Sequence, residues 1–294
     1  MSERGMDSVS KEMLQGGRRC VVVGVGTLGE GIVKELLSGP NQVLALDIQP
    51  DRLENLASEG DLGRLGTQVV DFRDTDGTVE AIRNFGPVDQ VYITVCPPRS
   101  HGGRHFWEED RQRLKDFWEL NVVAVGLFMH ALIQEDSGIL AKGAVIVPLS
   151  SGDGLEAVPA PYEVAHAGEA RFVAGLTEAL QVELNNARNE EGIRLTVPFP
   201  GPIIASDPEK DKDKPLDPII GGGESSLEVA RKIIKAAEKG QRKVITDWRV
   251  AAFAVLAPII SVFVTRERVE KFVYDQKQKI IEQTREKRSG SQNL

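Results

Sequence analysis

Short apolar runs alternate with segments of helical periodicity along most of the chain. Arg19 to Gly31 is expected to be a buried strand that runs through a glycine-rich turn into a helix, because three consecutive valines precede the glycines. Further strands are expected at 41–47, 68–71, 90–95, 143–151 and 193–198. Because helical patterns separate these runs, the sequence predicts an α/β fold built on a parallel, doubly wound sheet.

The helices between these strands have recognisable start and stop signals. The first ends at Gly39-Pro40; others are predicted from Asp51, from a cap at Asp74 or Asp76 to Phe85, over Glu108–Gln134, over Tyr162–Ala187, and from the capping box Ser225-x-x-Glu228 to near Gly240. The expected buried face of the 108–134 helix is Val122, Val123, Leu127, Ala131 and Leu132.

The glycines at 24, 26 and 29 fit the dinucleotide-binding fingerprint of a Rossmann-type fold. Gly24 permits the tight turn, Gly26 lets backbone approach a pyrophosphate, and Gly29 lets helix and strand pack closely. The free N–H groups at the start of the following helix attract phosphate. The alternative is that these glycines only make a tight connection.

Asp47 ends the second strand, close to the spacing of about 20 residues at which this fingerprint places an acid. A carboxylate there binds the ribose hydroxyls of NAD and repels the 2′-phosphate of NADP. We therefore expect NAD as the cofactor, with NADP less favoured. The alternative is that Asp47 only begins the turn at Gln49-Pro50-Asp51.

Composition narrows the class of protein. At 294 residues, the chain is long enough for one α/β domain with appendages. A net charge of -8 argues against nucleic acid as the main partner. Residues 1–17 are polar and lack the apolar core of a secretory signal, so we expect a disordered N-terminus and a cytoplasmic protein. Cys20 and Cys96 are expected at opposite ends of neighbouring strands, which argues against a disulfide.

Two segments outside the sheet pattern bear on the substrate. Residues 206–224 are polar and rich in Gly and Pro, typical of a mobile loop. Residues 250–264 are nearly all apolar but too short for an ordinary membrane span, so no integral span is expected and a buried wall, a substrate mouth and an oligomer contact stay open. A final helix carrying Val269, Phe272, Val273 and Ile280 is expected to pack on that segment or on a partner.

The expected organisation is a disordered segment at 1–17, a Rossmann-fold domain at 18–248, a C-terminal helical extension at 249–286 and a disordered tail at 287–294. His101 and His105 have a spacing that invites a metal interpretation. Gly102 and Gly103 lie between them and further ligands are not evident nearby, so no metal site is expected.

Residues 18 to about 248 resemble the short-chain dehydrogenase/reductase family. The matching motifs are the glycine turn, Asp71 after the third strand, Asn121 in Glu-Leu-Asn-Val-Val-Ala-Val-Gly, Ser150-Ser151 after the fifth strand, Tyr162, and Pro200-Gly201-Pro202-Ile203. The resemblance implies an NAD(P)-dependent oxidoreductase that acts on a small molecule and forms a homo-oligomer, a dimer or tetramer, through its long helices.

The resemblance also implies which residues form the site. The catalytic group would be Asn121, Ser151, Tyr162 and His166. With the glycine turn and Asp47, the cofactor-binding set would be Gly24, Gly26, Thr27, Leu28, Gly29, Asp47, Ile48, Asp71, Phe72, Val95, Tyr162, His166, Pro200, Gly201 and Ile203. Asp71 would contact the adenine, and the backbone near Ile203 would meet the nicotinamide amide.

The chain departs from the family pattern at two places. Tyr162-Glu-Val-Ala-His166 stands where the family has Tyr-x-x-x-Lys, and His166 can occupy the place of the lysine because residues four apart share a helix face. A histidine, with an ordinary pKa of about 6.5, is mostly neutral at neutral pH, so activation of the tyrosine should be weaker. Ile93-Thr-Val-Cys96 replaces Asn-Asn-Ala-Gly, and Val95 and Cys96 are expected to crowd the cofactor.

Three functions fit these residues. In the first, a carbonyl and a secondary alcohol are interconverted on a medium to large, fairly apolar molecule: Ser151 holds the oxygen, Tyr162 supplies the proton, and His166 relays it toward Asn121 and solvent. Ser150 remains an alternative to Ser151, which fits the Ser-x-x-Gly pattern better. In the second, the nucleotide serves only as scaffold or sensor. In the third, Asp153, Glu156, Glu163 or His166 acts as acid or base in an isomerisation or cyclisation. The alternative is that Tyr162 and His166 are ordinary helix residues and that Asn121 only supports a helix irregularity.

Overall fold

The computed structural model describes residues 17–59, 63–95, 105–134, 137–155, 164–187, 189–204 and 223–263, and several residues between 268 and 282. Its centre is a six-stranded sheet in the order β3-β2-β1-β4-β5-β6. The strands are β1 (Arg19–Val23), β2 (Gln42–Asp47), β3 (Leu65–Val69), β4 (Val88–Ile93), β5 (Leu140–Pro148) and β6 (Arg194–Leu195). All neighbours pair in parallel. The predicted doubly wound α/β fold is confirmed, and the strand order reverses between β1 and β4, where such folds bind ligands.

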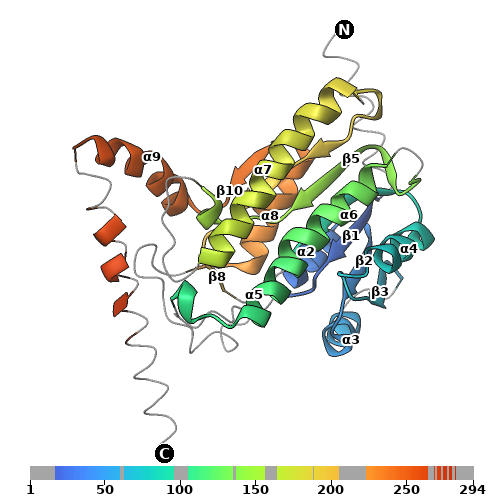
Figure 1. Cartoon of the computed structure of the whole chain (residues 1–294). Coiled ribbons are helices and arrows are strands. Elements are labelled where there is room, and N and C mark those ends of the chain that lie inside the picture. The colour runs from blue at the N-terminus through green and yellow to red at the C-terminus, as the bar shows by residue number, and fades with distance from the viewer. Residues whose placement is uncertain are drawn as a thin grey trace, which may run out of the picture.

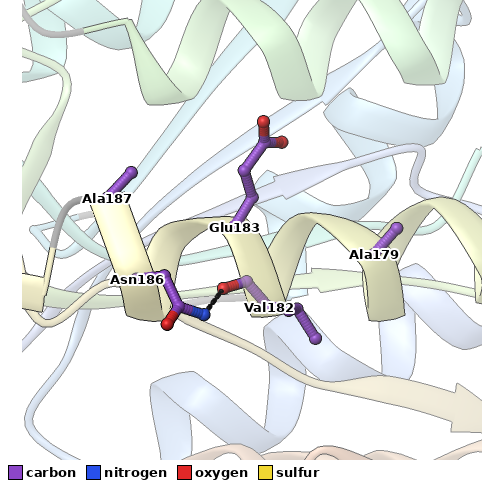
Figure 2. Close-up of a pocket in the computed structure, with 5 residues that line it drawn as sticks. All are labelled: Ala179, Val182, Glu183, Asn186 and Ala187. Carbon is purple, nitrogen blue, oxygen red and sulfur yellow. Dashed lines mark hydrogen bonds between the residues drawn. The ribbon is translucent and has the colours of Figure 1, made fainter.

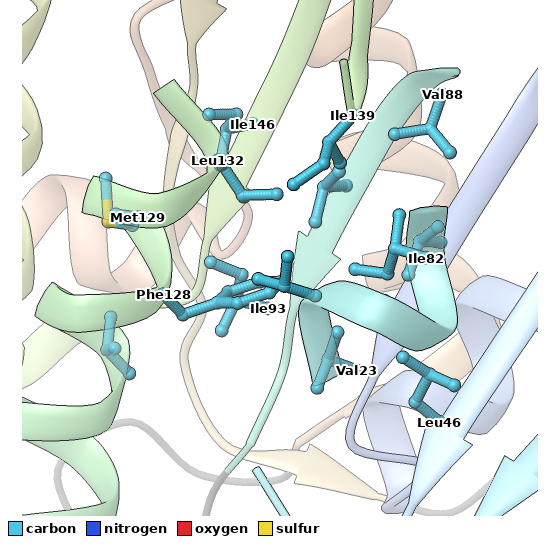
Figure 3. Close-up of a cluster of buried hydrophobic side chains, with 14 of the residues drawn as sticks. Val23, Leu46, Ile82, Val88, Ile93, Phe128, Met129, Leu132, Ile139 and Ile146 are labelled. Carbon is cyan, nitrogen blue, oxygen red and sulfur yellow. The ribbon is translucent and has the colours of Figure 1, made fainter. Parts of the chain in front are cut away.

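Helices cover both faces of this sheet (Figure 1). Along β1, Val21 and Val23 face one apolar cluster while Cys20 and Val22 face the other, because successive side chains of a strand point to opposite sides. The first cluster packs under α4 (Thr75–Phe85), α6 (Ala124–Ile133) and α7 (Val164–Ala187); Figure 3 shows part of it. The second packs under α2 (Thr27–Ser38), α3 (Pro50–Glu59) and α8 (Ser226–Glu238).

The sixth expected strand is interrupted. β6 ends at Leu195, and β7 (Val197–Phe199) follows after Thr196 and pairs in parallel with β10 (Lys243–Ile245). Thr196 N donates to Ile146 O at 3.0 Å, whereas Val197 N donates to Arg242 O at 2.8 Å. The segment therefore bonds to β5 at Thr196 and to β10 from Val197 onward, and β10 and β7 form a separate two-stranded sheet. A short pair, β8 (Ile203–Ile204) and β9 (Glu224–Ser225), follows.

Several predicted helix boundaries are confirmed. Asp74 caps α4 by accepting a hydrogen bond from Gly77 N at 3.0 Å, and α4 ends at Gly86, whose φ of 99° suits glycine. The capping box of Ser225 and Glu228 is present at the start of α8. In contrast, the third strand covers 65–69 and not 68–71, because it is a largely exposed edge strand without an apolar pattern.

The expected buried face of the 108–134 helix was wrong at Val123 and Leu127, whereas Leu132 is buried as expected. The chain forms α5 (Arg111–Trp118), a π-helical turn η2 (Glu119–Val123) and α6 as one continuous helix. Its buried side chains there are Asn121, Ala124, Val125, Phe128, Met129 and Leu132. Val123 and Leu127 are 50% and 54% exposed. The extra residue in the π turn rotates the following face by about 100°, and a run of apolar residues from 122 to 129 hides that rotation in the sequence.

The C-terminal helix α9 (Trp248–Phe263) extends away from the sheet (Figure 1). Val250 is buried at its start, while Trp248, Val255 and Leu256 are 74%, 63% and 50% exposed. The buried-wall interpretation of 250–264 therefore holds for Val250 and not for Val255 or Leu256. In the final segment Phe272 is 58% exposed. Val269, Val273 and Ile280, like residues 1–16, 205–222 and 283–294, lie outside the described residues.

One helix within the described ranges, Arg111–Ile133, has the length and apolar composition that could cross a membrane. Phe128, Met129 and Leu132 of this helix belong to the cluster against the sheet, the arrangement of a core helix.

Candidate functional site

The glycine turn closes tightly at the carboxyl end of β1. Gly24 has a φ of 92°, which favours glycine. A Cβ on Gly29 would overlap Gly24 O and lie 2.9 Å from Thr94 Oγ1, so helix α2 approaches the turn as closely as the fingerprint requires. Thr94 fixes the turn from the end of β4: its hydroxyl lies 2.6 Å from Gly24 O and its N–H donates to Val23 O at 2.8 Å.

Helix α2 begins beside this turn without a side-chain cap. Gly26 is the N-cap residue, and among the described residues a Cβ added to it would meet only Arg52 Nη1 within 4 Å, at 3.8 Å. Of the next two residues of the expected set, Thr27 is exposed and Leu28 is buried. The start of α2 therefore has no side-chain cap, so the first backbone N–H groups of the helix lack the partner that a capping side chain would supply, and such groups can bind an anion.

Asp47, at the end of β2, begins the turn at Gln49 as the alternative interpretation expected, and its ribose-binding role stays a prediction. One carboxylate oxygen accepts from Val25 N at 2.6 Å and the other from Gln49 N at 2.8 Å. Its side chain is 6% exposed, and Arg52 Nη1 lies 3.9 Å from Oδ2. Asp47 thus holds the glycine turn and starts the following turn, and Arg52 brings a cation to the same place.

The expected adenine side is formed by residues after β2 and β3. Asp71 forms an ion pair with Arg73 at 2.6 Å, and hydrogen bonds from the Arg73 side chain lower the pKa of Asp71 despite partial burial. Phe72 is buried and packs edge-on against Phe128 with ring centroids 5.1 Å apart, so only its backbone is available to a ligand. Ile48 is 52% exposed.

The two serines after β5 differ in their bonds. Ser150 Oγ donates to Ala170 O of α7 at 2.8 Å and is 5% exposed, so it ties the strand end to the helix. Ser151 Oγ accepts from Asp153 N at 3.3 Å and lies 3.5 Å from Asp153 Oδ2, at the start of a 3-10 turn η3 (Gly152–Gly154). Because the Ser150 hydroxyl already donates its hydrogen bond to α7, this geometry favours Ser151 as the serine of the site.

His166 lies in the first turns of α7, which packs against η3 and η2. Its Nδ1 is 2.9 Å from Glu169 Oε2 and its Nε2 is 3.9 Å from Asp153 Oδ2. The side chains of His166, Asp153 and Glu169 are 14%, 16% and 9% exposed. Ser151, Asp153, His166 and Glu169 therefore form a contiguous polar cluster.

Asn121 sits in the π turn with its Nδ2 donating to Phe117 O at 2.8 Å, and it is 2% exposed. This bond ties the Asn121 side chain to the backbone of the preceding helical turn. The geometry shows a structural bond for Asn121.

The far side of the site is built around two glycines. Gly152 N donates to Pro200 O at 2.9 Å. A Cβ on Gly201 would lie 2.8 Å from Asp247 Oδ2 and 3.2 Å from Val250 Cγ2, so the start of α9 packs directly on the Pro200-Gly201 segment. Ile203 is partly buried against the cluster under α2 and α8, and Val95 against the opposite cluster.

Some expected residues fall outside the described part of the chain: Tyr162, Glu156, Glu163, Cys96 and His101. His105 stacks on Trp107 with ring centroids 4.3 Å apart. Cys20 is a buried free thiol.

Three residues of this region were missed from the sequence. Thr94 matches no motif that predicts its hydrogen bond to the glycine turn. Arg52 follows Asp47 by five residues, at the start of a helix. Glu169 follows His166 by three residues, a helical spacing that would have predicted the contact between Glu169 and His166.

A surface depression of about 510 Å³ lies elsewhere, on α7, lined by Ala179, Val182, Glu183, Asn186 and Ala187 (Figure 2). Asn186 Nδ2 donates to Val182 O there at 2.7 Å. This depression is near the C-terminal end of α7, whereas His166 is near its N-terminal end, so it is separate from the polar cluster.

Comparison with known proteins identifies the family. The family model described as short chain dehydrogenase matches residues 18–215. The chain therefore belongs to the short-chain dehydrogenase/reductase family, which supports an oxidoreductase as its class of enzyme. A search of curated proteins gives no significant match.

Solved structures share the fold at low sequence identity. A short-chain dehydrogenase/reductase from Serratia marcescens is 20% identical, with a TM-score of 0.64 over 80% of this chain and 99% of that one. A short-chain glucose/ribitol dehydrogenase from Brucella melitensis is 17% identical, with a TM-score of 0.65 over 78% of this chain and 94% of that one. A tyrosine-to-phenylalanine variant of ElxO with NADPH bound is 19% identical, with a TM-score of 0.66 over 80% and 99% of the two chains.

Proposed function

We propose that this protein is an NAD(P)-dependent oxidoreductase that interconverts a carbonyl and a secondary alcohol on a medium to large, fairly apolar small molecule. The observation that carries the proposal is the N-terminus of α2 at Gly26, which has no side-chain cap and, among the described residues, only Arg52 within 4 Å of an added Cβ. Ser151 follows the carboxyl end of β5, and Asp153 Oδ2 lies 3.5 Å from Ser151 Oγ and 3.9 Å from His166 Nε2.

Each residue of the site has its own role in the proposed reaction. When bound, a nicotinamide cofactor supplies or accepts the hydride. Ser151 would hold the substrate oxygen, Tyr162 would exchange a proton with it, and His166 would pass that proton onward. Asn121 would support the helix beneath them through its bond to Phe117 O.

Stoichiometric change of NADH or NADPH with a panel of ketones and secondary alcohols tests this function. Tyr162→Phe should lower turnover by orders of magnitude while the nucleotide still binds. Tyr274→Phe, at a partly exposed tyrosine, is the matched control and should leave turnover unchanged. Equal turnover in the wild-type chain and Tyr162→Phe would refute the assignment.

For the cofactor we propose NAD, on the strength of Asp47, with NADP as the alternative that Arg52 favours. Asp47 already accepts two backbone hydrogen bonds, and Arg52, whose side chain is 43% exposed, can meet a 2′-phosphate beside it. Arg52→Gln should leave NADH affinity unchanged and weaken NADPH binding only if NADP is the cofactor. Arg83→Gln, an exposed arginine on α4, is the control. Fluorescence titration of the reduced nucleotides distinguishes the two cofactors.

A non-redox reaction is a second candidate, favoured by the carboxylate of Asp153 beside both Ser151 and His166. That arrangement can move a proton without a hydride. Product formed from a substrate while the nucleotide stays in one oxidation state would support the non-redox reaction for that substrate.

We also propose a homo-oligomer formed through α6 and α7. Val123 and Leu127 on this side are half exposed, Phe172 is 37% exposed, and a Cβ on Gly126 would lie 3.8 Å from Phe172 Cζ, so the two helices are adjacent. Val123→Glu should shift the mass measured by light scattering toward the monomer. Val69→Glu, at a valine 52% exposed on β3, should not. The domain boundaries at 18–248 and 249–286 and the cytoplasmic location stay predictions.

A further inference from the structure

His166 stands where the family has a lysine, and two carboxylates contact it. Glu169 Oε2 lies 2.9 Å from Nδ1 and Asp153 Oδ2 lies 3.9 Å from Nε2. Asp153 comes from η3, which packs against α7, and Glu169 is one turn along α7 itself. The elements α5 and η2 also pack against α7. The buried polar residue of η2 is the uncharged Asn121, and the charged side chains of α5 are exposed: Arg111, Arg113, Lys115 and Asp116. Both ring nitrogens thus face an acid.

This arrangement favours one charge state of the ring. A neutral imidazole has one N–H donor and one lone pair, whereas the imidazolium donates from both nitrogens. With a carboxylate on each side, a neutral ring would direct its lone pair at a negative charge. The side chains are at most 16% exposed, so solvent and salt screen the attraction only weakly.

We propose that Asp153 and Glu169 hold His166 as an imidazolium, which supplies at this site the cation that the family obtains from lysine. Glu169 is then a positioning residue, because it acts on His166 and touches neither Ser151 nor the glycine turn in the described contacts. Asp153 has a second role, since its N–H donates to Ser151 Oγ at 3.3 Å and its carboxylate lies 3.5 Å from that oxygen. The proposal rests on the oxidoreductase function above.

The charge state is measurable without any substrate. The full chain, labelled with [13Cε1]histidine, is titrated by NMR; the sequence has 4 histidines, and His166→Gln assigns the signal. We expect His166 to keep its proton to higher pH in the wild-type chain than in Glu169→Gln, by about one pH unit or more. Glu178→Gln, on the same helix but paired with Lys243, should titrate like the wild type.

Asp153→Asn gives a second, independent test if Glu169→Gln does not fold, and circular dichroism checks both variants. A His166 signal that titrates at the same pH in the wild type and in the folded variants would overturn the proposal. So would a wild-type ring that is already neutral near pH 6.

Activity gives the second readout. His166→Lys restores a permanent cation, so it should retain turnover and lose the decline that we expect in the wild-type chain as pH rises through the His166 titration. An inactive but folded His166→Lys, beside an active wild type, would show that a permanent cation cannot replace the imidazole ring, and would overturn the proposal. If no substrate turns over in any variant, the proposed function fails while the NMR result still decides the charge of His166.

Discussion

Replacing Thr94 with Val removes the bond that closes the glycine turn. Thr94 is 7% exposed, and its hydroxyl lies 2.6 Å from Gly24 O and 3.1 Å from Val23 O. A hydroxyl donates one hydrogen, and Val23 O already accepts from Thr94 N, so the shorter contact with Gly24 O is the one lost. Valine has nearly the same shape, and the change therefore isolates the hydrogen bond.

The expected cost follows from burial. A typical intramolecular hydrogen bond contributes about 1 kcal/mol net, and a buried carbonyl left without its donor costs up to about 3 kcal/mol. Thr94→Val should then lower the free energy of unfolding by about 1 to 3 kcal/mol. If about 1 kcal/mol of that loss is loosening of the turn that the cofactor must reorder, nucleotide affinity falls roughly fivefold.

Urea unfolding and fluorescence titration with NADH and NADPH measure these two quantities. Thr196→Val is the matched control: Thr196 is fully buried and its hydroxyl donates to Gln241 O at 2.8 Å, away from the glycine turn. It should lose a similar stability and keep its nucleotide affinity. The reasoning fails if Thr94→Val is as stable as the wild type, or if both variants bind nucleotide equally well.

Three further outcomes are expected elsewhere in the fold. Burial raises the pKa of Asp247, but two side-chain hydrogen bonds from Arg249, at 2.9 and 2.7 Å, and one from its backbone outweigh it and hold that pKa below its usual value. Arg249 bonds to the Asp247 carboxylate, so the stabilisation of the fold by these bonds is present at neutral pH and is lost as pH falls. Asp247→Asn should lower the free energy of unfolding at pH 7 by about 2 to 4 kcal/mol. It should also flatten the decrease of that free energy between pH 5 and 3, both measured by urea unfolding. Burial, and to a smaller extent Asp89, raises the pKa of the Cys20 thiol to about 12, so on the order of one molecule in ten thousand carries a thiolate at pH 8. Iodoacetamide should therefore label Cys20 only after unfolding, which peptide mass spectrometry measures. Asn121→Ala should lower the midpoint of urea unfolding by the equivalent of about 1 kcal/mol through loss of the bond to Phe117 O, and an unchanged midpoint would contradict that structural role.

The local pattern of the sequence was sufficient for most of the sheet and for the glycine turn after β1. Three valines before Gly24 predicted β1, and the glycine spacing predicted the turn in which Gly24 takes a positive φ and Gly29 meets the strand. Capping residues such as Asp74 and Ser225 predicted where helices begin. These features depend on residues within a few positions of each other, and interactions of this kind can be predicted from the sequence alone.

Contacts between distant segments were decided only by the tertiary structure. The sequence could not show that a π turn at Asn121 rotates the face of α6, because the apolar run there allows more than one face. It could not separate Ser150, which bonds to Ala170 O 20 residues away, from Ser151 beside Asp153. Periodicity reports which side of an element is buried, but not which group from another element arrives there. The two carboxylates on His166 became visible only once η3 and α7 were packed together.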